Sequence, residues 1–98
     1  MSAPQLTHED FQPHLDREFR FGGRPQVLRL AKIDVEDHPP LPGLDYKAFT
    51  LIFTGPRGDV LPEGLYAVET EGGARFDFYI LPIHTPAPDR QDYQAVFN

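Results

Sequence analysis

The sequence contains no cysteine and no tryptophan, and it has only 9 basic residues against 15 acidic ones among its 98 residues. The absence of cysteine excludes disulfides, thiolate nucleophiles and cysteine-based zinc or iron–sulfur sites. A formal net charge of -6 leaves no basic excess for binding nucleic acid or for docking on anionic membranes. We therefore expect no nucleic acid among the partners.

Long apolar runs and targeting signals are missing as well. No stretch approaches the roughly 20 apolar residues that a membrane-spanning helix needs, so we expect no membrane insertion. The first residues, Met-Ser-Ala-Pro-Gln, lack the basic and apolar regions of a signal peptide. The sequence predicts a cytoplasmic location by default, with packing into a secreted or phage-like particle as the alternative. No nucleotide-binding or phosphate-binding glycine loop occurs, and no cofactor is expected.

Aromatic residues and prolines are abundant. The sequence has 8 Phe, 4 Tyr and 11 Pro, and 40% of its residues are hydrophobic. Proline and negative charge are typical of disordered chains, but here the prolines gather at 37–43, 55–62 and 82–88, between aromatic segments. This arrangement predicts one folded domain over residues 1–98, with a loose leader at 1–5 and rigid connections.

The start of the chain predicts a short helix. Thr7 and Asp10 have the spacing of a capping box, and Leu6 and Phe11 that of a hydrophobic staple. Pro13 lies too deep in the segment for a regular helix, so we expect about two turns, short or broken. This helix is expected to plug one end of the fold or to cover an open edge.

The rest of the chain alternates apolar and polar residues in segments separated by turns, which is typical of strands. A change of phase near Ala31 and Lys32 predicts a β-bulge. The fold class predicted is all-β, a mostly antiparallel small barrel or sandwich of about six strands with one short N-terminal helix. The strand candidates are residues 19–21, 27–36, 49–53, 65–70, 74–81 and a last strand containing Tyr93, Ala95 and Phe97.

The densest polar cluster is a candidate metal site formed by Asp34, Glu36, Asp37 and His38. Carboxylates and imidazole bind divalent metals, but the spacing matches no calcium loop. A strand end that runs into a solvated loop explains the cluster better. The four histidines form no metal-ligand motif, so no metal is expected.

Catalytic motifs are equally scarce. There is no nucleophile elbow, and only Thr54 and Thr85 lie near residues that could act as partners. We therefore expect a protein that is not an enzyme. The alternative is a small-molecule-binding or carbohydrate-binding barrel, including a hydrolase with paired carboxylates, which requires an open cavity.

Residues that suit a contact surface are more frequent. Several tyrosines lie at strand starts or opposite the core positions, and exposed tyrosines are typical of interfaces, although half-buried rings with a solvated hydroxyl are the simpler interpretation. Residues 57–59 spell Arg-Gly-Asp in a loop, a triplet that also arises by chance in turns. The segment 61–66 is a candidate rim. The candidate surface residues are Tyr46, Tyr66, Tyr79, Tyr93, Arg57 and Asp59.

Three segments resemble those of a family of small bacterial β-rich proteins of unknown function. They are Leu-Thr-His-Glu-Asp-Phe at 6–11, Gly-Pro-Arg-Gly-Asp-Val-Leu-Pro-Glu-Gly-Leu-Tyr at 55–66, and Tyr-Gln-Ala-Val-Phe-Asn at 93–98. The resemblance covers nearly the whole chain and implies an association with phage-tail-like collar or fibre proteins. Its motifs are structural and carry no functional residue.

Taken together, the residues favour a non-enzymatic protein-interaction or structural accessory module. Its partner would be another protein or a second copy of the chain. The negative net charge favours a basic partner surface.

Overall fold

The structure, a computed structural model, describes residues 6–36 and 47–97, and it confirms the predicted fold class. Six strands follow one short helix and one 3-10 turn. Among the described residues, no helix is long and apolar enough to cross a membrane. The elements are α1 (His8–Phe11), η1 (Gln12–His14), β1 (Glu18–Phe21), β2 (Val27–Val35), β3 (Phe49–Gly55), β4 (Gly64–Thr70), β5 (Arg75–Pro82) and β6 (Gln91–Phe97).

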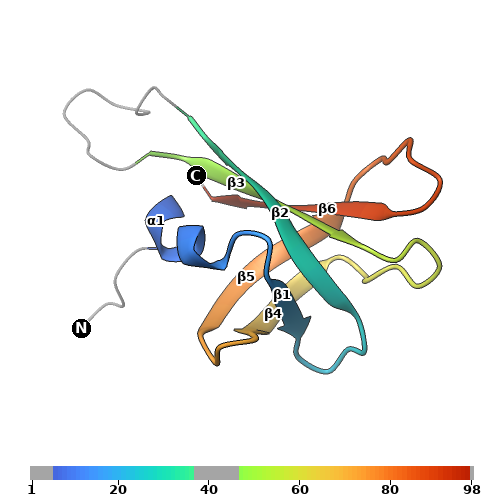
Figure 1. The fold of residues 1–98 in the computed structure, drawn as a ribbon, viewed down its shortest axis with the longest axis horizontal. Helices are drawn as coiled ribbons and strands as arrows, with labels where there is room; N and C mark the ends of the chain where they lie inside the picture. Colours follow the sequence, from blue (N-terminus) through green and yellow to red (C-terminus); the bar gives the residue numbers. More distant parts are fainter. Residues whose placement is uncertain (1–5, 37–46, 98) are drawn as a thin grey trace.

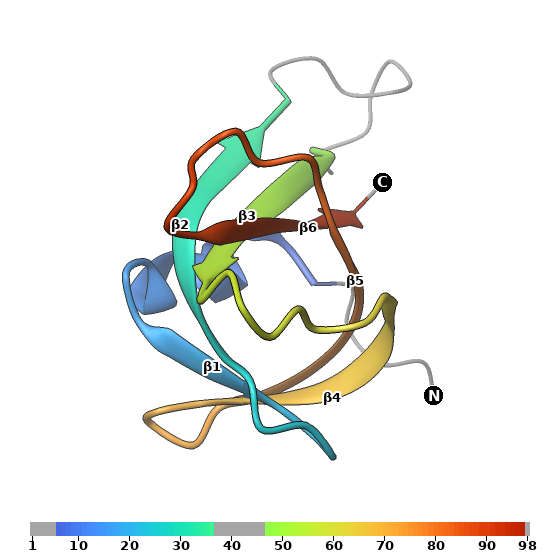
Figure 2. The same ribbon diagram turned by 90° about the vertical axis from the view of Figure 1, so that its right-hand side faces the viewer.

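The six strands close into a barrel in the order β1-β2-β3-β6-β5-β4, and every neighbouring pair is antiparallel. Long pairings join β2 to β3, β3 to β6 and β4 to β5. The closure between β5 and β6 is much shorter, because just two positions of β5, Leu81 and Pro82, are paired with β6. From these positions β5 and β6 diverge, and α1 lies beside the widening gap (Figure 1). Figure 2 shows the strands arranged around the barrel.

The bulge predicted near Ala31 and Lys32 is confirmed. The β2–β3 register shifts between Leu30 and Lys32, so that Ala31 is the extra residue. Before the shift Leu28 and Leu30 point inward, and after it Ile33 and Val35 pack against the core. The bulge therefore keeps one apolar face inward along a strand that bends around the barrel.

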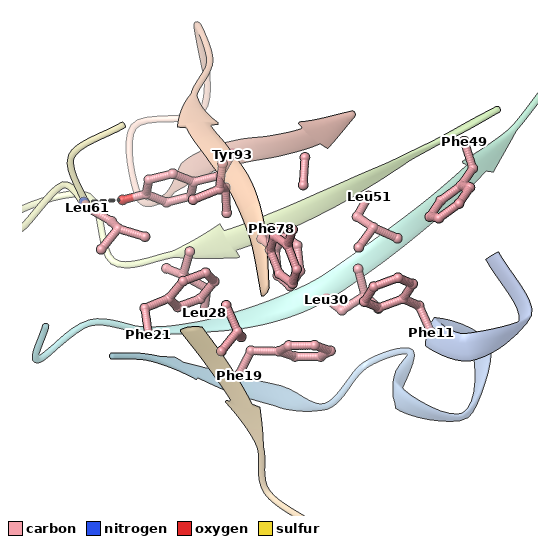
Figure 3. Close-up of a cluster of buried hydrophobic side chains, with 14 residues drawn as sticks. Phe11, Phe19, Phe21, Leu28, Leu30, Phe49, Leu51, Leu61, Phe78 and Tyr93 are labelled. Carbon is pink, nitrogen blue, oxygen red and sulfur yellow. Dashed lines mark hydrogen bonds between the residues drawn. The ribbon is translucent and has the colours of Figure 1, made fainter. Parts of the chain in front are cut away.

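Aromatic rings fill the barrel. Six of the eight phenylalanines are buried, and the other two, Phe76 and Phe97, pack against the buried cluster. The rings contact one another mostly edge-on or tilted, as in the T-shaped pair of Phe19 and Phe53, whose centroids are 5.1 Å apart. Figure 3 shows these side chains converging on the interior from opposite walls of the barrel.

Phe11 seals one end of the barrel from α1. Its ring is fully buried, with centroids 4.6 Å from Phe76 on β5 and 5.4 Å from Phe97 on β6. The helix begins as predicted, because the Thr7 N–H donates to the Asp10 carboxylate at 2.8 Å and Leu6 packs against the core. The expectation that the helix plugs one end of the fold is confirmed. The Phe11 side chain thus contacts both β5 and β6 where the backbones of these two strands diverge.

Leu61 packs into the interior from the segment that joins β3 to β4. Its side chain is fully buried, and its backbone N–H donates to the Tyr93 hydroxyl at 2.9 Å (Figure 3). The predicted rim at 61–66 is thus corrected at its first residue, because Leu61 belongs to the core.

Two glycines allow the chain to close tightly. Gly73 has φ +91° in the turn between β4 and β5, a conformation that L side chains avoid. A Cβ at Gly55 would collide with the Cδ2 methyl of Leu28, which is itself buried in the core. Gly55 thus allows the backbone of β3 to pass close to the Leu28 side chain of β2.

Replacing Phe11 with alanine tests whether this ring closes the barrel. The substitution should lower the free energy of unfolding by about 3–5 kcal/mol, because it removes a buried ring and leaves a cavity. Urea denaturation followed by circular dichroism measures the change. Gln12→Ala, at an exposed neighbouring position, should change stability by no more than about 0.5 kcal/mol. Equal effects of the two substitutions would contradict the role of Phe11.

Gly55→Ala tests the close approach of β3 to Leu28. The added methyl should destabilise the protein by about 1–3 kcal/mol, because the packed core leaves Leu28 no room to move. Gly58→Ala is the matched control, since nothing lies within 4 Å of its Cβ position. Thermal unfolding of the two variants should show a clear loss for Gly55→Ala alone.

Candidate interaction surface

An apolar pair is exposed on the outside of the barrel. Leu65 on β4 lies opposite Tyr79 on β5 in the strand register, so their side chains are neighbours on the outer face. Leu65 is 72% exposed and Tyr79 is 47% exposed, which is unusual for large side chains in a barrel that buries most of its aromatic rings. The pair is the most prominent apolar feature of this face.

The pair continues into a polar surface on the same two strands. Ala67 lies opposite Asp77, and Glu69 lies opposite Arg75, whose Nε is 3.2 Å from the Glu69 carboxylate. We call these three pairs, six residues in all, the β4–β5 face: Leu65, Ala67, Glu69, Arg75, Asp77 and Tyr79. A groove of about 990 Å³ lies along it and reaches Leu6 and Asp10 at the start of α1.

Tyr79 is held in place by a neighbouring carboxylate. Its hydroxyl donates a hydrogen bond to Glu63, in the segment before β4. This hydrogen bond raises the pKa of Tyr79 above its ordinary value, with smaller contributions from desolvation and from the Glu63 charge. The exposed ring thus has a fixed hydroxyl and presents its apolar side to solvent.

The other predicted tyrosines have different environments. Tyr66 is half-buried, donates from its hydroxyl to the Pro62 carbonyl and packs edge-on against Phe21. Tyr93 is corrected, because it points into the barrel and is fully buried. Its position in β6 places it on the same side as Ala95, the side that the strand turns inward. Tyr46 lies outside the described residues.

The Arg57 side chain has a partner within the molecule. Its Nη1 donates to the carbonyls of Thr85 and Arg90, each at 3.1 Å, and also to that of Ala87. Arg57 therefore braces the connection between β5 and β6. Asp59 is exposed and borders a separate, smaller surface groove.

The predicted metal cluster is described only in part. Asp34 and Glu36 lie at exposed positions at the end of β2, while Asp37 and His38 lie outside the described residues. Within 6–36 and 47–97, no group of three or more histidine, aspartate or glutamate side chains could hold a metal ion.

Of the two threonines considered for catalysis, Thr54 lies in β3, opposite Arg29 and Asp92 in the strand register, and Thr85 takes part in local hydrogen bonds. The Thr85 hydroxyl donates to the Ile83 carbonyl and accepts from the Asp92 N–H, while His84 is exposed. The centre of the barrel is occupied by side chains, and the groove along the β4–β5 face opens on the surface. In the part of the chain that the structure describes, the ligand-binding alternative is left with this groove, which Phe21, Val68 and Phe76 also line.

Leu65 and Val96 were not singled out as individual site residues from the sequence. The signal was present in the alternation. Leu65 has the opposite parity to Val68 in its strand, and Val96 has the opposite parity to Ala95. An apolar residue on the outward parity of an otherwise regular strand is a useful indicator of a contact surface.

Comparison with known proteins gives one match. The family described as a Domain of unknown function (DUF6916) matches residues 6–97. No curated protein and no solved structure matches the chain.

The buried Tyr93 predicts a loss of stability in alkaline solution. Burial raises the pKa of Tyr93 above its ordinary value, although the hydrogen bond from Leu61 opposes the shift. Above a pH of about 10 the unfolded chain loses this proton first, so the free energy of unfolding should fall as the pH rises further. Urea titrations between pH 7 and pH 11 measure the decline.

Tyr93→Phe should flatten this alkaline decline. At neutral pH it should also cost about 1–3 kcal/mol, because the buried Leu61 N–H loses its acceptor. Tyr66→Phe, at a half-buried tyrosine outside the barrel centre, serves as the control and should keep most of the decline. An unchanged alkaline profile in Tyr93→Phe would show that other groups cause it.

Proposed function

The chain belongs to the DUF6916 family, and we propose that it is a non-enzymatic interaction module that binds another protein through the β4–β5 face. The observation that carries this proposal is the exposed pair of Leu65 and Tyr79. Large apolar and aromatic side chains at the centre of a patch, surrounded by polar residues, are the usual anchors of protein interfaces.

The surroundings of Leu65 and Tyr79 indicate that the pair serves as a contact surface and is not exposed by chance. Tyr79 is fixed by its hydrogen bond to Glu63, so little side-chain freedom is lost when a partner covers the ring. The adjoining residues Glu69, Arg75 and Asp77 supply charges of both signs at the edge of the patch. Further along the same two strands, a groove lined by Ala67, Glu69 and Asp77 offers a partner a concave surface.

The filled interior favours a binding module over an enzyme. Each end of the barrel is packed with a buried apolar side chain, Phe11 from α1 and Leu61 from the segment before β4. A substrate cleft of the usual kind needs a concave site with converging polar groups. Thr85, one of the two threonines considered for catalysis, is hydrogen-bonded within the β5–β6 connection.

A finer hypothesis places the module in a phage-tail-like or surface-fibre assembly, as a structural or accessory part. It rests on the resemblance of residues 6–11, 55–66 and 93–98 to small bacterial proteins. The barrel suits such a role, because it is rigidly filled and offers its contact surface on the outside. Co-purification with a tail-like particle, lost on substitution of Leu65, is the test of this hypothesis.

Substitution of Leu65 with lysine tests the proposed surface. The variant should weaken the complex with the partner about 30-fold, because a central anchor contributes about 2 kcal/mol or more to binding. It should leave the fold intact, since Leu65 is 72% exposed. Affinity capture from lysate of the source cells, followed by calorimetry with the captured partner, measures the change.

Leu15→Lys is the matched control, because Leu15 is also an exposed leucine but lies outside the β4–β5 face. It should bind the partner as the unmodified protein does. Equal weakening by both substitutions would contradict the assignment of the face. A protein that stays monomeric and retains no partner at any concentration would contradict the proposed function itself.

A further inference from the structure

The closure between β5 and β6 leaves backbone groups without a strand partner. The register pairs Leu81 with Gln94, and the next opposed position would join Tyr79 to Val96. That pair does not form, and no residue of β5 before Leu81 is paired with β6 among the described residues. The side of Tyr79 and Asp77 that faces β6 is thus a strand edge inside a nominally closed barrel.

The hydrogen-bond pattern identifies which groups face this edge. The Thr70 N–H donates to the Ala74 carbonyl, so the even-numbered residues of β5 direct their backbone groups toward β4. The odd-numbered residues face β6, as the bond from Ile83 N–H to the Asp92 carbonyl shows. The N–H and C=O groups of Asp77 and Tyr79 therefore point into the gap.

The same reasoning places a second edge on β6. The Glu36 N–H donates to the Ala48 carbonyl, which directs the odd-numbered residues of β3 toward β6. The odd-numbered residues of β6 bond to β3 in turn, and the even-numbered ones face β5. The backbone groups of Val96 therefore face the gap from the other side, and the Val96 side chain is 47% exposed.

Side chains, not backbone, close the barrel behind the gap. The Phe11 ring lies between Phe76 and Phe97, and these two rings are themselves only partly buried. Figure 1 shows β5 and β6 diverging toward α1. An extended chain entering the gap would thus meet hydrogen-bonding edges and apolar ring surface together.

The charges around the gap select the occupant. The groove on the β4 side of β5 is lined by Asp10, Glu69 and Asp77 and by Arg20 and Arg75, and of these Asp77 also belongs to the edge that faces the gap. Arg75 is paired with Glu69, while Asp77 belongs to no ion pair with another described residue. Glu63 lies nearby, bonded to Tyr79. With a net charge of -6, the protein repels a second copy of itself and attracts a basic segment.

We propose that the gap between β5 and β6 accepts an extended strand of a partner protein in which apolar residues alternate with lysine or arginine. The strand bonds through its backbone to Asp77 and Tyr79. Its apolar side chains contact Phe76 and Phe97, and its basic side chains lie on the outer face beside Asp77. This inference rests on the proposed function, because it gives the form of the partner segment.

Titration with a defined peptide tests the inference. The probe is a seven-residue peptide of alternating valine and lysine with blocked ends, and its acidic counterpart has glutamate in place of lysine. We expect the basic peptide to shift the amide resonances of Asp77, Tyr79 and Val96 and to slow their hydrogen exchange at least tenfold. The acidic peptide should bind at least tenfold more weakly. Absence of these shifts, or equal binding of both peptides, would overturn the inference.

Proline variants separate strand pairing from contact with the face. Asp77→Pro removes an N–H that faces the gap, while Asp77→Ala keeps it, so the proline variant should lose peptide binding at least tenfold more than the alanine variant. Val96→Pro repeats the test on β6 should Asp77→Pro impair folding. If both proline variants bind as well as Asp77→Ala, strand addition is wrong.

Leu65→Lys distinguishes the two proposals. If this substitution abolishes binding of the natural partner while both proline variants retain it, the interaction module stands and the strand-accepting gap fails. If the unmodified protein instead forms a dimer that Asp77→Pro converts to a monomer, the gap pairs with a second copy and the basic occupant is wrong. Loss of both peptide and partner in Asp77→Pro, with binding weakened at least tenfold less in Asp77→Ala, supports the inference.

Discussion

The Phe11 ring, lying between Phe76 and Phe97, is the contact on which the rest of this structure depends. Six short strands close into a barrel only if every neighbouring pair meets, and here β5 and β6 meet at one end alone. The helix α1 supplies the missing apolar surface, so the core is sealed without a complete ladder of hydrogen bonds. The cost is a pair of strand edges, and these edges lie beside the exposed residues of the proposed interface.

This arrangement connects the fold to the proposed function. Among the described residues, side chains fill the barrel, which favours contacts with other molecules on its outer surface. Among the described residues, Leu65 is the most exposed of the large hydrophobic side chains, and its neighbour Tyr79 lies on β5, the strand that has an open edge. Arg57 braces the connection between β5 and β6 by hydrogen bonds to the carbonyls of Thr85 and Arg90. The two strands are therefore held together at the end where they pair.

Much of the fold followed from the alternation of residues. Three local patterns predicted elements that the structure contains. They are the capping box at Thr7 for α1, the change of phase at Ala31 for the bulge in β2, and the alternation of Phe76 and Phe78 for β5. The surface was harder to predict. Tyr93 and Tyr79 are both tyrosines in strands, but Tyr93 has the inward parity of Ala95, whereas Tyr79 has the parity opposite to the buried Phe78 and Ile80. The short β5–β6 pairing depends on where two distant segments meet, which no local pattern records.

The most direct test of the open edge is native-state hydrogen exchange of the free protein, resolved by residue. The account predicts little protection for the amides of Asp77, Tyr79 and Val96. It predicts exchange at least about a hundredfold slower for Phe78 and Ile80, whose amides bond to β4. Protection of Asp77 and Tyr79 equal to that of Phe78 would mean that the gap is closed by hydrogen bonds, and it would contradict the account.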